Sequence, residues 1–129
     1  MAGSDAAKAG RESRGRTAYH AGQAAEDQVS RLYDRSGRPV IARRWRGSIG
    51  EIDLIAREGD VVVFIEVKKS ATHAQAAEHL TWRQQQRIMA TASEFVGGEP
   101  RGQLTDMRFD VALVDAMGRI EIIENALAA

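Results

Sequence analysis

The sequence predicts an α/β sandwich in which helices flank a mixed sheet of about five strands, in the order α-β-β-β-α-β-β. Two stretches carry apolar residues at helical spacing, and the segments between and after them are β-prone or alternate in polarity. The chain has 129 residues, 43% of them hydrophobic, which is enough apolar material for one core. We therefore expect a single domain over residues 17–129, preceded by a flexible basic arm over residues 1–16.

The first predicted helix covers residues 17–36. Apolar side chains recur along it at intervals of three and four, at Ala21, Ala25, Val29, Leu32 and Tyr33. Gly37 follows and can adopt the left-handed backbone conformation that ends a helix. These features predict an amphipathic helix with one buried face.

Three strands are predicted next, over residues 39–45, 50–56 and 61–67. Alternation in the second strand divides its side chains between two faces, with Glu51, Asp53 and Ile55 on one and Ile52, Leu54 and Ala56 on the other. Residues 57–60 are polar and include a glycine. The second and third strands are therefore predicted to form a hairpin.

The rest of the chain predicts one long helix and two further strands. Residues 70–80 have weak periodicity and predict a loop or a short helix. Thr81 and Gln84 fit a capping box that begins the long helix, and the glycines and proline of residues 97–100 end it. The last two strands are expected over residues 108–114 and 119–123.

The composition excludes several kinds of site. The chain has no cysteine, which excludes disulfides, thiolate zinc sites, iron–sulfur clusters and a cysteine nucleophile. Its histidines, His20, His73 and His79, do not have the spacing of zinc ligands. No run of 18 apolar residues and no secretion-signal stretch is present, so we expect a cytoplasmic protein without a membrane segment.

Two carboxylates and a lysine are predicted to share one face of the hairpin. Alternation places Glu66 beside Lys68, and near-symmetric pairing about residues 58–60 brings Asp53 close to Glu66. Such oxygen ligands suit Mg²⁺ or Mn²⁺, and Glu26 can reach the sheet from the border of the first helix's apolar stripe. The alternative is a solvated face, with Glu66 and Lys68 in an ion pair worth about 0–1 kcal/mol and Glu26 exposed.

The charges are distributed unevenly along a chain of zero net charge. Residues 1–47 carry 10 Lys and Arg against 5 Asp and Glu, whereas residues 48–129 carry 8 against 13. Arginines lie near the first strand around Trp45, at Arg35, Arg38, Arg43, Arg44 and Arg46. They could contact phosphates while Trp45 stacks on bases, or they could pair with nearby carboxylates while Trp45 packs on the core. Trp82 is predicted to pack against the sheet.

Several short motifs in a fixed order resemble a known family. They include residues 50–56 (GEIDLIA), residues 63–68 (VFIEVK), Gly22, Ala25 with Glu26, the segment from Thr81 to Ile88, residues 108–110 (RFD), and Asn125 with Ala126. Over about residues 19–126 the chain resembles the uncharacterised UPF0102 (YraN-like) bacterial family. That family is placed in the restriction-endonuclease-like superfamily, near the archaeal Holliday junction resolvases.

The resemblance implies a nuclease-like domain with a restriction-endonuclease-like fold. It implies that Asp53 and Glu66 bind Mg²⁺ or Mn²⁺, that Glu26 supports this metal shell, and that Lys68 lies beside the attacking water. It also suggests that the polar side chain of Gln84 points at the site. The candidate nucleic-acid contacts are Arg43, Arg44, Arg46 and Lys69. The chain departs from the family pattern at Lys69, which precedes Ser70 instead of the usual arginine, and at Arg44, where asparagine is common.

Three functional interpretations follow. The first is a Mg²⁺-dependent DNA endonuclease that hydrolyses phosphodiester bonds, with branched DNA as a candidate substrate and a homodimer expected if junctions are cut on both strands. The second is a non-catalytic module that keeps the fold and binds nucleic acid, or docks onto a DNA-processing partner. A scaffold without a nucleic-acid role is the third and least specific interpretation, which a pI near 6.8 allows.

Overall fold

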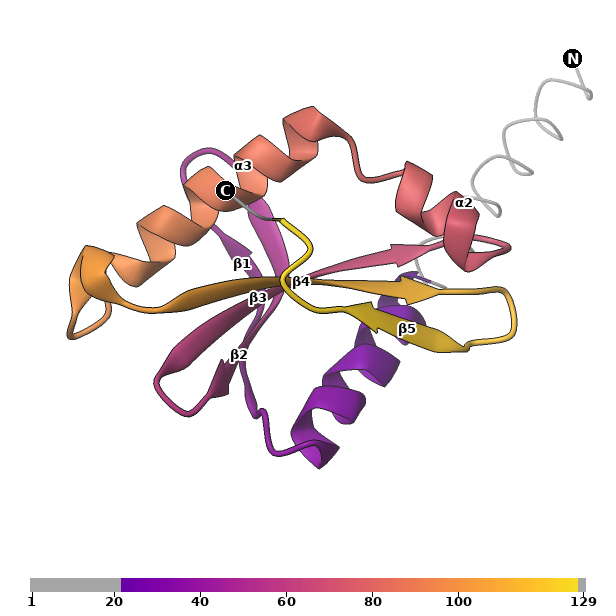
Figure 1. The fold of residues 1–129 in the computed structure, drawn as a ribbon, viewed down its shortest axis with the longest axis horizontal. Helices are drawn as coiled ribbons and strands as arrows, with labels where there is room; N and C mark the ends of the chain where they lie inside the picture. The colour runs from indigo at the N-terminus through magenta and orange to yellow at the C-terminus, as the bar shows by residue number, and fades with distance from the viewer. Residues whose placement is uncertain (1–21, 128–129) are drawn as a thin grey trace, which may run out of the picture.

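The structure is a computed structural model that describes residues 22–127 (Figure 1). Five strands form one open sheet, in the order β1-β2-β3-β4-β5. They are β1 (Val40–Arg46), β2 (Glu51–Glu58), β3 (Val61–Lys69), β4 (Met107–Val114) and β5 (Ile120–Ile123). β3 and β4 are parallel and the other neighbours are antiparallel. The predicted α/β class and mixed five-stranded sheet are confirmed, and the expected arm over residues 1–16 lies outside the described residues.

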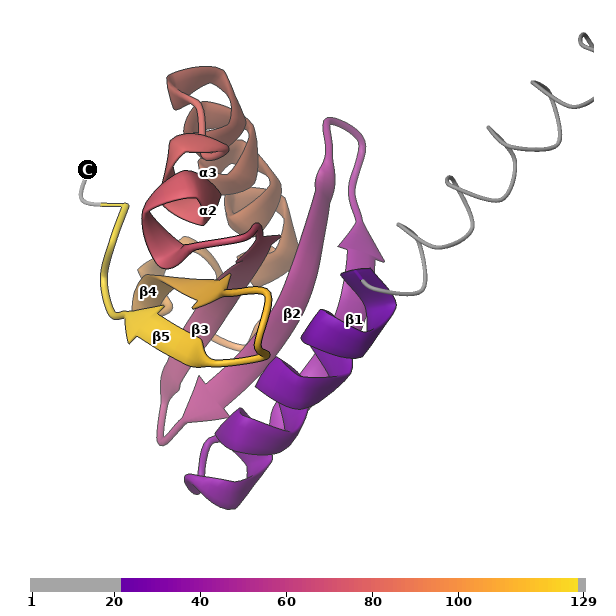
Figure 2. The ribbon, with the colours of Figure 1, turned by 90° about the vertical axis from the view of Figure 1, so that its right-hand side faces the viewer.

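Helices lie on both faces of the sheet (Figure 2). The N-terminal helix, described over residues 22–35, covers one face, and α2 (His73–Glu78) and α3 (Trp82–Val96) cover the other. The predicted capping box begins α3, because the Gln84 amide donates to Thr81 Oγ1 at 3.2 Å and the Thr81 amide donates to Gln84 Oε1 at 3.3 Å. No helix within residues 22–127 has both the length and the apolar character needed to cross a membrane.

Each face of the sheet has its own apolar layer. The layer under the N-terminal helix includes Ala25, Val29, Tyr33, Leu54, Ala56, Val63 and Ile65. The layer under α3 includes Ile55, Val62, Phe64, Ile88, Ala92 and Val96. Helical spacing on the helices and alternation on β3 therefore bury the predicted faces. With packing on both faces, β2 and β3 offer a rigid support for the polar side chains near their ends.

The strict alternation predicted for residues 50–56 is wrong at Ile52. Ile52 belongs to the layer under α3 together with Ile55, instead of the opposite layer with Leu54. The paired register of β2 and β3 is regular only as far as Leu54, and the neighbouring β1 turns at Arg44, where φ is +49°. The pairing of β1 with β2 stays in register from Ala42 to Arg46, so the positive φ of Arg44 and the end of the β2–β3 pairing mark the point at which Ile52 faces the layer under α3.

Trp82 lies outside the core, so the prediction that it packs against the sheet is also wrong. Its exposed fraction is 72%. The buried face of α3 begins at Ile88, and six residues at about 100° each place Trp82 about 120° away from Ile88 around the helix axis. The apolar stripe of α3 therefore turns away from the sheet before it reaches Trp82.

A buried carboxylate joins the N-terminal helix to β4. Asp110 is 1% exposed, and its Oδ2 accepts a hydrogen bond from the Tyr33 hydroxyl at 2.7 Å. Its Oδ1 accepts from Arg108 Nε at 3.0 Å and from the Asn125 amide at 3.1 Å. Burial, together with the hydrogen bond to Asp110, raises the pKa of Tyr33. Both oxygens of Asp110 are engaged within the fold, so its role is structural.

Candidate functional site

Asp53 and Glu66 meet where the regular pairing of β2 and β3 ends. Their side chains are hydrogen-bonded to each other, as the predicted hairpin pairing requires. Asp53 Oδ2 also accepts a hydrogen bond from the backbone amide of Val67 at 2.8 Å. The side chain of Glu66 is only 13% exposed. Two carboxylates from neighbouring strands are therefore held together in a mostly buried position.

The environment of this pair changes the protonation of Glu66. Burial, followed by the hydrogen bond and negative charge of Asp53, raises the pKa of Glu66 to about 9, and Lys68 opposes this rise. Near neutral pH the pair therefore holds one proton between its two carboxyl groups. Two desolvated carboxylates in contact need either a proton or a cation between them. The pair is thus a place where a cation could replace a proton.

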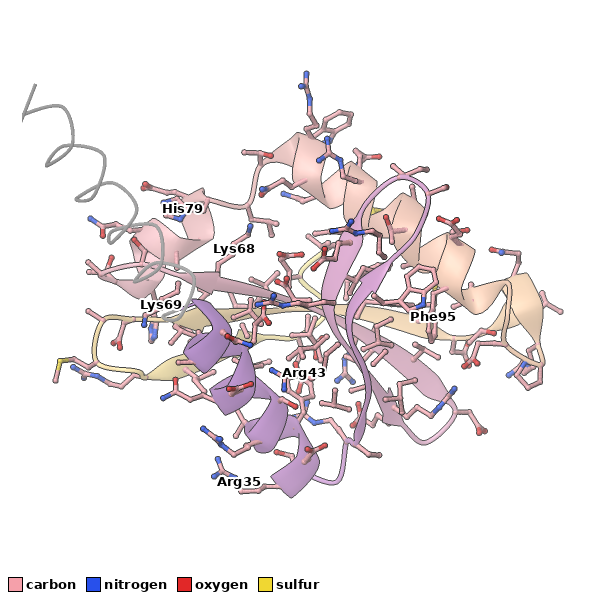
Figure 3. All side chains as sticks on the ribbon, turned by 180° about the vertical axis from the view of Figure 1, so that it is seen from behind. Arg35, Arg43, Lys68, Lys69, His79 and Phe95 are labelled. Carbon is pink, nitrogen blue, oxygen red and sulfur yellow. The ribbon has the colours of Figure 1, made fainter. Side chains whose placement is uncertain are left out.

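Lys68 completes the predicted patch. Its Nζ lies 3.7 Å from Glu66 Oε1, and its side chain is 17% exposed. Lys69, the next residue on β3, is exposed and lies on the other side of the strand (Figure 3). The predicted side-by-side arrangement of Glu66 and Lys68 is therefore present. The catalytic role of Lys68 stays a prediction.

A cavity of about 210 Å³ opens beside the pair, between the start of β2 and the first turns of α3. Its walls are formed by Gly50, Glu51, Glu66, Gln84, Arg87 and Ile88. Gly50 allows a close approach of the two elements, because a Cβ atom there would lie 2.7 Å from Cγ of Arg87. The volume suits a hydrated ion or a phosphate group. Sequence reasoning did not propose Arg87, although its place one helical turn after Gln84 indicates the same face of α3.

Gln84 takes part in two features of this region. Its side-chain Oε1 is part of the α3 capping box, and the residue also lines the cavity next to Glu66. The capping contact alone explains why a glutamine stands at this position. A contact between Gln84 and a substrate stays a prediction.

Glu26 approaches the site from the opposite layer. Burial raises its pKa and so does the charge of Asp53, while its hydrogen bond with Arg44 lowers it. The Arg44 Nε donates to Glu26 Oε2 at 3.0 Å, so this carboxylate already has a partner. Within residues 22–127, no group of three or more His, Cys, Asp or Glu side chains is arranged to hold a metal ion. The carboxylates in direct contact are thus Asp53 and Glu66, and a supporting role of Glu26 stays a prediction.

The arginines predicted to contact nucleic acid form ion pairs within the protein. Arg43 pairs with Asp27, Arg44 with Glu26, and Arg46 with Glu51 at 3.2 Å. Trp45 packs edge-on against Phe95, with 5.2 Å between ring centroids. These contacts match the alternative in which the arginines pair with carboxylates and Trp45 packs on the core. They disfavour stacking of Trp45 on bases. Arg46 is still 79% exposed, and its partner Glu51 lines the cavity.

The fold and the site define a class: small α/β proteins in which a mixed sheet holds a buried carboxylate pair next to a lysine. Within this class, the chain belongs to the uncharacterised protein family UPF0102, whose family model matches residues 25–114.

Relatives of the same family are similar over most of their length. A UPF0102 protein of Cereibacter sphaeroides (strain KD131) is 71% identical over 115 residues, which are 89% of this chain and 98% of the relative. A UPF0102 protein of Ruegeria pomeroyi is 60% identical over 88% of this chain and 93% of the relative. One from Dinoroseobacter shibae is 47% identical over 89% of this chain and 86% of the relative. The resemblance found in the motifs is therefore confirmed at the level of the family.

Proposed function

We propose that the protein is a divalent-metal-dependent nuclease that hydrolyses phosphodiester bonds in DNA. The observation that carries this proposal is the hydrogen-bonded pair of Asp53 and Glu66, with Lys68 Nζ 3.7 Å from Glu66 Oε1. Burying two carboxylates against each other costs free energy, so a purely structural role would be served better by apolar residues. A group of this kind beside a cavity is characteristic of functional sites.

The residues fit Mg²⁺ or Mn²⁺. Carboxylate oxygens are hard ligands, and Mg²⁺ is commonly held by one or two carboxylates together with phosphate oxygens of the substrate. Asp53 and Glu66 would hold the ion, and Glu26 would support them from the opposite layer. When bound, the ion would neutralise charge on the phosphodiester and lower the pKa of a water molecule.

The remaining side chains have defined tasks in this proposal. The ammonium group of Lys68 would orient the attacking water and stabilise the negative charge that develops on the phosphorane oxygens. The backbone amide of Val67 fixes the orientation of the Asp53 carboxylate through its 2.8 Å hydrogen bond. Gln84 and Arg87 on the cavity wall would contact the substrate phosphate.

Contacts to the DNA backbone would come from exposed cations around the site. Lys69 is exposed, and Arg43, Arg44 and Arg46 would each have to exchange a carboxylate partner for a phosphate. Branched DNA is one substrate class within the proposal. Cutting opposing strands of a junction would require two copies of the chain, and therefore a homodimer.

One observation favours the second interpretation, a non-catalytic module. Among the described residues, no three ligand-type side chains are gathered around one point, so an ion would depend on Asp53, Glu66 and groups outside the protein. In a non-catalytic module the pair would keep its proton permanently. Its binding of nucleic acid would weaken with salt and would not respond to Mg²⁺.

The test is a calorimetric titration of Mg²⁺ and of Mn²⁺ into the wild type and Asp53→Asn, followed by incubation with four-way, flapped, single-stranded and linear DNA. We expect stoichiometric ion binding that is lost in Asp53→Asn, and cleavage of at least one substrate by the wild type only. Asp60→Asn is the matched control, because Asp60 is exposed on the turn of the same hairpin. Absence of both ion binding and cleavage in the wild type would reject the nuclease and favour the non-catalytic module.

A further inference from the structure

Arg87 is a cation without a carboxylate partner on the wall of the cavity beside the carboxylate pair. The two carboxylates that line the same cavity have other partners, because Glu51 pairs with Arg46 at 3.2 Å and Glu66 Oε1 lies 3.7 Å from Lys68 Nζ. Within residues 22–127, the guanidinium of Arg87 forms neither an ion pair nor a hydrogen bond. This guanidinium can therefore take an anion without losing a partner in the described part of the fold.

The position of Arg87 on α3 directs it to the cavity. At about 100° per residue, Arg87 lies about 60° from Gln84 around the helix axis, and Thr91 lies between them. Gln84 lines the cavity as Arg87 does, while Thr91 is fully buried. Arg87 thus stands where the buried face of α3 meets the cavity.

Gly50 holds the stem of Arg87 in place from the opposite wall. A Cβ atom at Gly50 would lie 2.7 Å from Cγ and 2.8 Å from Cδ of Arg87. The turn before Gly50 is fixed to α3, because the Ser48 amide donates to both carboxylate oxygens of Glu94, at 3.1 and 2.9 Å. The stem of Arg87 is therefore confined between α3 and the backbone of Gly50. A confined side chain loses less conformational entropy when it binds a ligand.

A phosphate group matches the chemistry of this cavity. A guanidinium group forms two parallel charge-assisted hydrogen bonds to phosphate oxygens. Glu66 of the carboxylate pair borders the same cavity of about 210 Å³. Mg²⁺ that is held by one or two carboxylates commonly takes phosphate oxygens as further ligands. A phosphate on Arg87 would thus supply ligands that the carboxylate pair alone cannot give to an ion.

We infer that the cavity is a phosphate-binding site in which Arg87 holds the phosphate group, and that this phosphate and a divalent ion on Asp53 and Glu66 increase each other's affinity. The coupling is reciprocal, so either ligand can bind first. The inference deepens the proposed function and rests on it for the ion. Binding of phosphate to Arg87 needs no ion, so it can be measured separately from ion binding and hydrolysis.

The first experiment titrates inorganic phosphate, and separately a thymidine dinucleotide with one phosphodiester, into the protein in EDTA and follows binding by calorimetry. We expect both to bind the wild type, and Arg87→Gln to weaken the binding about 10-fold. Gly50→Ala should weaken it as well, because the added Cβ displaces the stem of Arg87 without removing its charge. Urea unfolding checks that each variant is folded.

Arg35→Gln is the matched control, because it removes the same charge from an exposed arginine on the N-terminal helix, which covers the other face of the sheet (Figure 3). Phosphate that does not bind, or that Arg87→Gln and Arg35→Gln bind equally well, would overturn the inference. Binding of inorganic phosphate without binding of the dinucleotide would support a site for free phosphate and reject the DNA backbone as its ligand.

The second experiment measures the coupling by titrating Mn²⁺ with and without sulfate, which stands in for phosphate, is not hydrolysed and keeps Mn²⁺ in solution. We expect sulfate to tighten Mn²⁺ binding about 10-fold in the wild type and in Arg35→Gln, but not in Arg87→Gln. Equal Mn²⁺ binding with and without sulfate in the wild type would overturn the coupling. Arg87-dependent phosphate binding without any Mn²⁺ binding would support the phosphate site and reject the nuclease. Asp53-dependent cleavage with phosphate binding that is independent of Arg87 would reject the phosphate site alone.

Discussion

At the scale of single residues, Glu66 shows how a buried site residue can make the stability of the folded protein depend on pH. Its pKa is raised from 4.5 to about 9 by burial and by Asp53. The folded protein therefore holds this proton more tightly than the unfolded chain does. The resulting stabilisation is fully present below the unfolded pKa of about 4.5, and it is lost as the pH rises toward about 9. This pH dependence should be measurable in the free energy of unfolding of the ion-free protein.

Glu66→Gln should remove this pH dependence, because a neutral amide keeps a hydrogen bond to Asp53 without a titrating charge. We expect the free energy of unfolding of the wild type in EDTA to fall between pH 5 and pH 9 more than that of Glu66→Gln, so that the variant is the more stable protein at pH 9. Urea unfolding at pH 5, 7 and 9 measures this difference. Glu78→Gln is the control at an exposed glutamate. Parallel pH profiles of wild type and Glu66→Gln would contradict the expectation.

At the scale of elements, the start of α3 combines a capping function with a wall of the cavity. Thr81→Ala should cost about 1 kcal/mol in the free energy of unfolding, because the Gln84 amide loses its acceptor. Gln84→Ala removes the reciprocal bond to the Thr81 amide and should cost no more than this. If Gln84 only caps the helix, both variants keep the wild-type cleavage rate at a temperature where they are folded. If Gln84 contacts the substrate, Gln84→Ala alone loses rate. Urea unfolding and single-turnover cleavage, measured side by side, separate these outcomes.

Much of this element structure could be predicted from local patterns, and the failures have a common cause. The capping box, the hairpin and the approach of Asp53 to Glu66 depend on residues close in sequence or on the symmetry of one turn. The face on which Ile52 lies and the exposure of Trp82 depend on tertiary packing, which local patterns do not contain. The ion pairs of the arginines join the N-terminal helix or β2 to β1. The sequence pattern could therefore suggest these ion pairs only as an alternative to phosphate contacts.

At the scale of the whole molecule, the basic surplus of residues 1–47 is partly neutralised by the fold. Arg43 pairs with Asp27 and Arg44 with Glu26, and these pairs place carboxylates from the N-terminal helix beside the arginines of β1. A DNA backbone that approaches this edge would meet fewer uncompensated cations than the sequence suggests. The salt dependence of DNA binding should therefore report which arginines exchange their partners for phosphates.

Asp27→Asn should strengthen DNA binding by releasing Arg43 for a phosphate contact. Both side chains of this pair are more than 40% exposed, so its loss should change the free energy of unfolding little. We expect the slope of log affinity against log salt concentration to become steeper by about 0.9, the contribution of one phosphate contact on duplex DNA. Anisotropy titrations between 50 and 300 mM KCl measure this slope, with Asp60→Asn as a control that removes one carboxylate from the β2–β3 turn. Because both variants change the net charge equally, an equal slope in the two would mean that Arg43 does not reach the DNA. A steeper slope in Asp27→Asn alone would place the backbone of the bound DNA along β1.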